Sequence, residues 1–123
     1  MINSVWVNRG DIWLVSFDPQ VGDEIRKIRP SVVMSQPGIY RYQLHIVVPI
    51  TTWKPYFEDD FWMVELFPTS QNGLRNHSAA NAFQIKSLSS QRFIKRLGNI
   101  TLDELQELTV AVVLTVGWGI EDM

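Results

Sequence analysis

Short apolar runs alternate with polar, turn-rich segments along most of this chain. The runs are rich in β-branched and aromatic residues and are separated by pairs such as Asp18-Pro19, Pro37-Gly38 and Asn72-Gly73. Such runs predict β-strands, because branched and aromatic side chains suit a pleated surface and Gly, Pro, Asn and Asp favour turns. We expect strands at residues 12–17, 31–35, 44–50, 61–66 and 78–87, a helical turn at 90–94 and a short strand at 95–98. The third run is nearly all apolar, which predicts a strand covered on both faces.

The last segment changes from the strand period to the helical period. Thr101-Leu-Asp-Glu104 matches a capping box, in which the first and last side chains each bond to the other's backbone N–H. Apolar residues then recur at helical spacing, at Leu102, Leu105, Leu108 and Val112. Residues 110–116 are apolar except for Thr115, so we expect this half to be buried in the core or at an interface, with Gly117 ending the helix.

Five or six short strands, long loops and one final helix predict a mainly β (α+β) protein. A small closed or half-closed β-barrel fits this number of strands better than a sandwich. The 123 residues suit a single domain, 1–123. The chain has no run of eighteen apolar residues and no basic N-terminal segment followed by a long apolar core, so we expect a cytoplasmic protein that does not enter a membrane.

Composition and charge narrow the chemistry. The chain has no cysteine, which excludes disulfides, thiolate zinc sites and cysteine nucleophiles. The formal net charge is −2, whereas a protein that coats duplex DNA is usually basic. Any nucleic acid would therefore be bound by a local cationic site.

One loop is a candidate for such a site. Residues 22–30 hold three cations, Arg26, Lys27 and Arg29, and two carboxylates, Asp23 and Glu24. Either these are solvated loop charges or the loop grips a phosphate. Arg29 directly precedes Pro30, and the residue before a proline is confined to extended conformations, so its side chain is held at a stiff strand entrance.

An ordered series of segments resembles the MazF/PemK (also Kid) family of toxin endoribonucleases. The series is Arg9-Gly-Asp-Ile-Trp-Leu-Val-Ser-Phe-Asp-Pro19, Gly22-Asp-Glu24, Arg29-Pro-Ser-Val-Val33, Val48-Pro-Ile-Thr51, Gln84-Ile-Lys-Ser-Leu-Ser-Ser-Gln-Arg92 and Leu97-Gly98. The resemblance implies an SH3-like barrel of the type shared with the CcdB gyrase poison. It also implies a homodimer.

By position, the resemblance assigns the catalytic pair to Arg29 and Thr51, acting together on the scissile phosphate. The RNA 2′-hydroxyl would be the nucleophile, and the implied products are a 2′,3′-cyclic phosphate and a 5′-hydroxyl, formed without a metal or other cofactor. Arginine is a poor base, so we assign Arg29 to charge stabilisation. Glu24 is the candidate general base or a positioner of Arg29. From the residues alone, the pattern favours Thr51 as a strand-end threonine that satisfies a neighbouring backbone group, and Glu24 could equally be an exposed loop carboxylate.

Further residues are candidates for RNA binding. Trp53 lies among polar residues and could stack on a splayed base, although most tryptophans, including Trp13 and Trp62, are expected in the core. The Thr52 hydroxyl follows the catalytic position, and Gln84 keeps a family position as a minor contact. Cations that could hold flanking phosphates are Arg26, Lys27, Lys54 and Arg75.

The chain departs from the family in two places. Asp23 and Ile25 replace the serine and glutamine of the common Gly-Ser-Glu-Gln segment. Phe83 stands where many relatives have an acidic residue that is proposed as the catalytic acid. His77, in the loop before that expected strand, is an alternative proton donor or an exposed loop histidine.

We therefore predict a sequence-specific endoribonuclease toxin that cleaves single-stranded messenger RNA and is restrained by an acidic, partly disordered MazE-like antitoxin. Two alternatives remain open. A non-nucleolytic gyrase binder of the CcdB kind would use a C-terminal aromatic and apolar pair, for which Trp118 and Ile120 qualify. A degenerate toxin would bind its antitoxin without cutting RNA.

Overall fold

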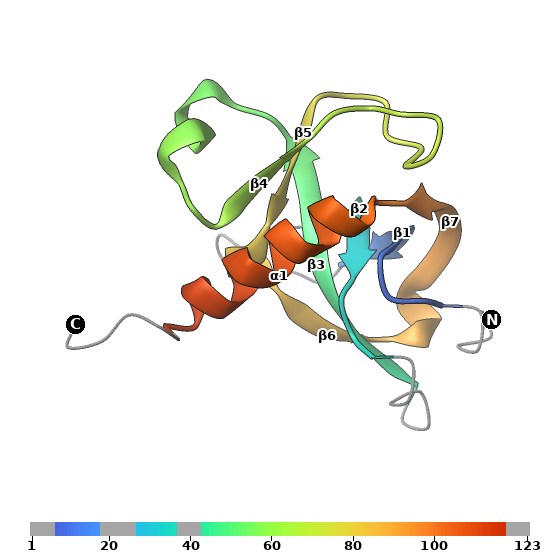
Figure 1. Ribbon diagram of the computed structural model, residues 1–123. Coiled ribbons are helices and arrows are strands. Elements are labelled where there is room, and N and C mark those ends of the chain that lie inside the picture. Colours follow the sequence, from blue (N-terminus) through green and yellow to red (C-terminus); the bar gives the residue numbers. More distant parts are fainter. Residues whose placement is uncertain (1–6, 18–26, 37–42, 118–123) are drawn as a thin grey trace.

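A computed structural model describes residues 7–17, 27–36 and 43–117 of the chain (Figure 1). It confirms the expected mainly β class with one final helix. The strands are β1 Asp11–Ser16, β2 Ile28–Val33, β3 Leu44–Thr52, β4 Met63–Leu66, β5 Ser78–Asn81, β6 Lys86–Ser89 and β7 Phe93–Asn99. The helix α1 spans Leu102–Thr115, and three short 3₁₀ helices lie at η3 Pro55–Asp59, η4 Ala82–Gln84 and η5 Ser90–Arg92.

All the strands pair antiparallel, in the order β4-β5-β3-β2-β1-β7, and β6 also pairs with β3. The nine-residue β3 is the central element, because its first half pairs with β6 and its last residues pair with β5. Among the described residues, β7 pairs with β1 alone. The sheet is therefore strongly curved but is not closed into a full barrel.

Strand alternation divides the apolar side chains between the two faces of the sheet. In β1, Ile12 belongs to a cluster beneath α1, whereas Trp13 and Val15 belong to a second cluster on the other face. The helix-side cluster takes Leu105 and Leu108 from α1, which crosses this face of the sheet (Figure 1). Both clusters follow from the two-residue period of strands.

The helix begins as the capping box predicts. Thr101 Oγ1 accepts a hydrogen bond from Glu104 N at 3.1 Å, and Thr101 N donates to Glu104 Oε1 at 2.8 Å. The second half of α1 is only partly covered, since Val110 and Val116 are 57% and 74% exposed. Across the described parts of the chain, no helix has the length and apolar character needed to cross a membrane.

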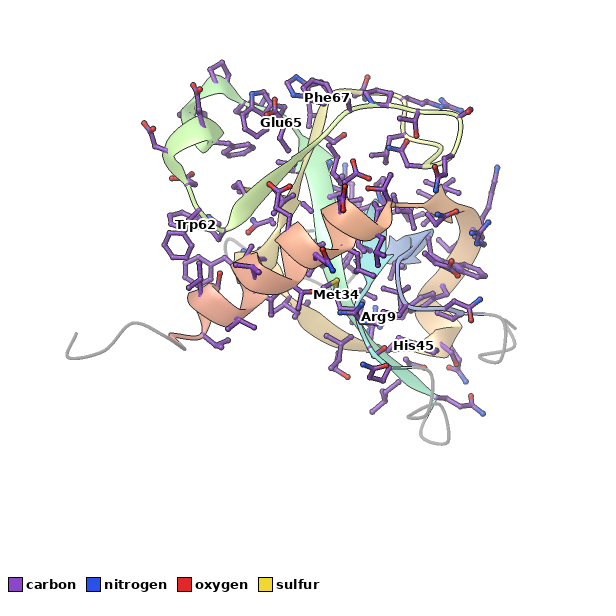
Figure 2. The ribbon with its side chains drawn as sticks, in the orientation of Figure 1. Arg9, Met34, His45, Trp62, Glu65 and Phe67 are labelled. Carbon is purple, nitrogen blue, oxygen red and sulfur yellow. The ribbon has the colours of Figure 1, made fainter. Side chains whose placement is uncertain are left out.

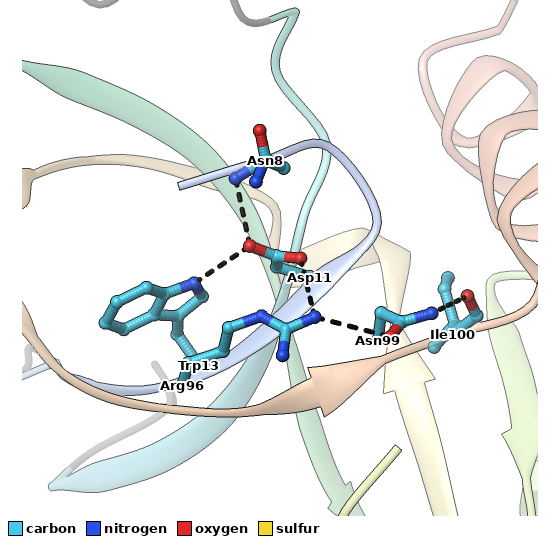
Figure 3. Close-up of polar contacts among 6 residues, drawn as sticks. All are labelled: Asn8, Asp11, Trp13, Arg96, Asn99 and Ile100. Carbon is cyan, nitrogen blue, oxygen red and sulfur yellow. Dashed lines mark hydrogen bonds and ion pairs between the residues drawn. The ribbon is translucent and has the colours of Figure 1, made fainter. Parts of the chain in front are cut away.

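A buried carboxylate joins β1 to the loop before it and to β7 (Figure 3). Asp11 Oδ2 accepts from Asn8 N at 3.0 Å and from Trp13 Nε1 at 3.3 Å, and Asp11 Oδ1 accepts from Arg96 Nη2 at 3.2 Å. Asn99 extends this network, because its Oδ1 also accepts a hydrogen bond from Arg96 Nη2. This network holds the two neighbouring strands in register.

The expectation of one continuous strand over residues 78–87 is wrong. The segment forms β5, the η4 turn and then β6. Between the pairs Ile50↔Ala80 and Val47↔Lys86, β3 advances by three residues and the facing segment by six. The extra residues form the η4 turn, which begins where the Asn81 side chain accepts from Phe83 N at 3.0 Å. The asparagine cap therefore interrupts the strand.

Four other expectations need correction. β2 begins at Ile28, before Arg29 and Pro30, because the pre-proline residue and proline are both held extended. β3 continues to Thr52, where β5 still provides a partner. β3 is also not covered on both faces throughout, since Leu44 and Ile46 are 44% and 39% exposed. Trp62, expected in the core, is half-buried at the edge of the helix-side cluster.

Candidate functional site

A pocket of about 380 Å³ lies where the ends of β2 and β3 meet β7 and the loop between β4 and β5. The polar and charged residues among the described lining are Arg29, Thr51, Thr52, Arg75, Asn76, Ser78 and Lys95. The apolar part of the wall includes Leu14, Ile50, Leu74 and Leu97. The pocket thus brings together residues from five separate segments of the chain.

Arg29 is held in β2 opposite Val15 of β1. Its side chain is half-buried, and its Nε is a buried donor without a hydrogen-bond partner among the described residues. Burying an unsatisfied donor costs about 1–3 kcal/mol. An incoming anion would provide the missing acceptor, so this guanidinium is suited to binding a ligand.

Thr51 comes to the same pocket from the neighbouring strand. β2 and β3 pair through Ser31↔Pro49, and two further steps along this register bring Arg29 opposite Thr51. On its other side, Thr51 faces Ala79 of β5. The pair expected from the sequence therefore reaches one pocket from two neighbouring strands.

Arg75 is positioned by a loop that is organised around the buried Asn72. Asn72 Oδ1 accepts from Thr69 N and Leu74 N, both at 3.0 Å, and Asn72 Nδ2 donates to Phe67 O at 2.8 Å. The turn needs Gly73, whose φ is +68° and where a Cβ would lie 2.4 Å from Leu97 O. The predicted Asn72-Gly73 turn is thus present, within a loop that is fixed against β7.

Lys95 lines the pocket and was missed by the sequence analysis. It lies opposite Leu14 of β1, which also faces Pro30 of β2. Its neighbour Arg96 lies on the other face and bonds to Asp11. Lys95 and Arg96 are neighbouring cations in a short strand, so the sequence does not distinguish them. The register of β7 on β1, which includes two shifts, determines which of the two lines the pocket.

The pocket is cationic although the whole chain is slightly acidic. Three cations line it, and the described lining residues include no aspartate or glutamate. The formal net charge of the chain is −2. This local concentration of positive charge favours a phosphate or another anion.

The other expected site residues are distributed around the pocket or away from it. Trp53 is half-buried and stacks on His77, and neither residue lines the pocket. Lys54, at the start of η3, is exposed, and so is Lys27, which precedes β2. Gln84 is half-buried in η4. Glu24 and Arg26 lie outside the described residues, as do Trp118 and Ile120.

Phe83 does not lie in a strand, contrary to the expectation for residues 78–87. It lies in η4, is 67% exposed and packs edge-to-face on Trp62, with ring centroids 5.9 Å apart. Phe83 takes no part in the wall of the pocket.

The family model for the PemK-like, MazF-like toxin of type II toxin–antitoxin systems matches residues 8–115. A curated relative, endoribonuclease MazF9 of Mycobacterium tuberculosis, is 29% identical over 114 residues, which cover 88% of this chain and 94% of that protein.

Solved structures share the fold at low identity. MazF from Deinococcus radiodurans matches with a TM-score of 0.76 at 23% identity, covering 90% of this chain and 96% of that one. An endoribonuclease in complex with its cognate antitoxin, from a mycobacterial species, matches with a TM-score of 0.71 at 17% identity, covering 91% and 96%. The family match includes every described strand and the helix, so the chain belongs to the PemK-like, MazF-like toxin family of type II toxin–antitoxin systems.

Proposed function

We propose that this protein is an endoribonuclease toxin that cuts single-stranded messenger RNA in the cytoplasm, at a specific sequence and without a metal. The observation that carries the proposal is the pocket in which Arg29 and Thr51 lie together with two further cations. Its volume of about 380 Å³ suits a nucleotide-sized group. The curated relative MazF9 is itself named an endoribonuclease.

The proposed reaction is an internal transfer of the phosphoryl group. The RNA 2′-oxygen forms a bond to the adjacent phosphorus as it loses its proton, and the bond from phosphorus to the 5′-oxygen breaks as that oxygen gains a proton. The products are a 2′,3′-cyclic phosphate and a 5′-hydroxyl. Since RNA carries its own nucleophile, the protein has to align the attack, stabilise charge and transfer protons.

Arg29 and Thr51 fit charge stabilisation. The guanidinium offers donors in a planar fork that matches phosphate oxygens, and its unpartnered Nε is available to them. The Thr51 hydroxyl can donate to a second oxygen of the same phosphate. Donors aimed at a developing oxyanion typically contribute about 10²–10³ in rate. Glu24 remains our candidate for the base.

RNA cleavage in EDTA tests this assignment. Purified wild type should cut a long single-stranded RNA at a short repeated motif and leave cyclic-phosphate ends. Arg29→Ala should lose about 10²-fold or more in rate. Thr51→Val, which keeps the shape and removes the hydroxyl, should also be impaired, while Thr51→Ser should recover much of the activity.

A matched control removes a cation elsewhere. Lys86 on β6 does not line the pocket, so Lys86→Gln should cut like wild type. Cleavage by Arg29→Ala at the wild-type rate would show that the assignment of Arg29 is wrong. Folded wild type that cuts no RNA would favour the gyrase-binding or degenerate alternatives, and gyrase inhibition would then distinguish these two.

We further propose that a MazE-like antitoxin restrains the toxin by covering the pocket with an acidic segment. The cationic lining supports this, because an acidic peptide would compete with phosphate for the same groups. Addition of the cognate antitoxin should abolish cleavage. Charge reversal by Lys95→Glu should weaken that inhibition.

We also propose a homodimer formed through the second half of α1. Val110 and Val116 are exposed there, and Phe83 of the adjoining η4 is 67% exposed. Apolar surface left open in one chain is a common feature of subunit interfaces. Wild type should sediment as a dimer and Val110→Glu as a monomer. Leu102→Glu, at the other end of α1 and 70% exposed, should remain dimeric. A monomeric wild type would contradict this proposal.

A further inference from the structure

Three rings form a parallel stack across the adjoining ends of β3, β5 and β4. Trp53 and His77 have ring centroids 5.2 Å apart and planes inclined by 17°. His77 and Phe67 are closer, at 4.5 Å and 10°. The imidazole is therefore covered by one aromatic ring on each face. The stack ends at Phe67, which lies beyond the end of β4 beside Glu65 (Figure 2).

Each ring is held in place by a separate contact. His77 Nε2 lies 2.6 Å from Glu65 Oε2. The backbone N of Trp53 donates to His77 O at 2.9 Å, which extends the pairing of β3 with β5. Phe67 O accepts from the buried Asn72 side chain at 2.8 Å. The stack is thus preorganised, so a ligand that joined it would lose little additional protein entropy.

The open surface of the stack is the outer face of Phe67. Trp53 has one face on His77, and Phe57 meets it edge-on with centroids 5.8 Å apart at 85°. Phe67 is 57% exposed, and within the described residues His77 is the one aromatic ring that it stacks on. A flat group that extended the stack would therefore lie on Phe67 rather than on Trp53.

The stack begins at the edge of the cationic pocket. Trp53 directly follows Thr52, which is the last residue of β3 and lines the pocket. His77 lies between Asn76 and Ser78, which both line the pocket. A strand of RNA with a phosphate at Arg29 could therefore continue directly along the stack.

The chemistry at the end of the stack suits a base better than a phosphate. Phe67 and Trp53 carry no charge, and the Glu65 carboxylate beside them would repel a phosphate. Every nucleobase has a flat π-face that stacks on an aromatic ring, and unpaired bases in RNA are commonly bound in this way.

We infer that Phe67 is a base-stacking subsite for one unpaired nucleotide of the RNA, next to the nucleotides held in the cationic pocket. This inference rests on the proposed function, since it names how the same RNA is bound beyond the scissile phosphate. It also revises the expectation that Trp53 itself stacks on the base, because Trp53 supports the stack from its inner end.

The first test measures binding of a short single-stranded oligoribonucleotide that spans the mapped cleavage site. A 2′-O-methyl group at the attacking position prevents cleavage. Phe67→Ala should bind about tenfold more weakly than wild type, and Phe67→Trp, which keeps a flat ring, should bind like wild type. Because no phosphate contact is lost, the dependence of affinity on salt should stay unchanged in Phe67→Ala.

Phe61→Ala is the matched control. Phe61 is 53% exposed and packs edge-to-face on Trp62 with centroids 5.1 Å apart. Trp62 precedes the first residue of β4, at the opposite end of the strand from Phe67 (Figure 2). Phe61→Ala should bind the oligonucleotide like wild type. Thermal melting of each variant shows whether the altered protein is folded, and Phe67→Trp tests the stack without truncating the side chain.

An abasic scan identifies the stacked nucleotide. Each base of the oligonucleotide is removed in turn, and binding is measured with wild type and with Phe67→Ala. At one position, loss of the base should weaken binding to wild type about tenfold and leave binding to Phe67→Ala unchanged. This coupling would place that base on Phe67, which a merely structural role of the side chain could not produce.

Equal binding by wild type and Phe67→Ala would overturn the inference, as would identical abasic profiles for the two proteins. If binding is equal but wild type still cuts RNA, the proposed function stands and only the stacking subsite is wrong. A protein partner that covers Phe67 would then explain the exposed ring better. If wild type neither binds nor cuts RNA, both the proposed function and the subsite fail.

Discussion

Arg96 Nη2 donates to Asp11 Oδ1 at 3.2 Å, between two strands that pair side by side. The contact engages the Arg96 side chain, whereas the adjacent Lys95 lies opposite Leu14 and lines the pocket. Two adjacent cations thus have different roles, one in stability and one at the candidate site.

Replacing the buried carboxylate should destabilise the fold. Asp11→Ala removes the acceptor of three donors, Asn8 N, Trp13 Nε1 and Arg96 Nη2. Trp13 Nε1 would be left without an acceptor in the core, and Asn8 N would be left without one in a partly buried position. We therefore expect a loss of about 2–4 kcal/mol in the free energy of unfolding. Urea denaturation measures it. Asp103→Ala, an exposed position in the first turn of α1, should cost less than about 1 kcal/mol. Equal losses of unfolding free energy in Asp11→Ala and Asp103→Ala would show that the hydrogen bonds of Asp11 do not stabilise the fold.

Lys95 should contribute to RNA binding through charge alone. Lys95→Ala should weaken binding at low salt and reduce the slope of log affinity against log salt by about 0.7, the value for one phosphate contact on a single strand. The free energy of unfolding should change little, because Lys95 is exposed. Titration of the cleavage-blocked oligonucleotide over a range of salt concentrations measures the slope. An unchanged slope would show that Lys95 does not contact a phosphate of the RNA.

Gly73 should be needed both for folding and for placing Arg75. In Gly73→Ala, the new Cβ would meet Leu97 O at 2.4 Å, on a residue whose φ is +68°. We expect a combined loss of about 2–5 kcal/mol from the strained backbone and the clash, with slower RNA cleavage. Gly117 provides the comparison, since its φ is +97° but nothing lies within 4 Å of its Cβ position. Gly117→Ala should therefore cost only about 1–2 kcal/mol. Similar melting temperatures for the two variants would refute the steric argument.

His45 should make stability depend on pH. Burial lowers the pKa of His45 from its ordinary value of 6.5, and its ring packs against Phe93 with centroids 5.0 Å apart. The unfolded chain then binds a proton more readily than the folded one, so stability is complete above pH 6.5 and falls as the pH drops below it. His45→Gln removes this titration. The difference in unfolding free energy between wild type and His45→Gln should shift against wild type below pH 6.5. A difference that is constant with pH would exclude this role.

Local sequence signals predicted the elements whose causes are themselves local. The capping box at Thr101 and Glu104 fixed the start of α1, because both hydrogen bonds form within one helical turn. The Asn72-Gly73 pair marked the turn near Arg75 for the same reason. The family and the mainly β class were also evident, since the resemblance depends on ordered short segments rather than on contacts.

Errors arose where one strand had to serve two partners. Nothing within residues 78–87 indicates that β3 pairs with both β5 and β6. The residue that caps the turn between β5 and β6, Asn81, is an ordinary polar residue in an otherwise strand-like run. The exposed position of Phe83 follows from that break. Pairing along β3 is a long-range constraint, so a local pattern does not reveal it.

The sequence by itself determined the family, the helix, most of the strands and the choice of Arg29 and Thr51 as the central candidates. The tertiary structure decided which cations share their pocket and which aromatic ring is left open. Lys95 and Arg96, or Phe67 and Phe61, are equivalent residues when read in isolation. Strand register and sheet curvature assign them to different surroundings, and these depend on hydrogen bonds between segments that lie far apart along the chain.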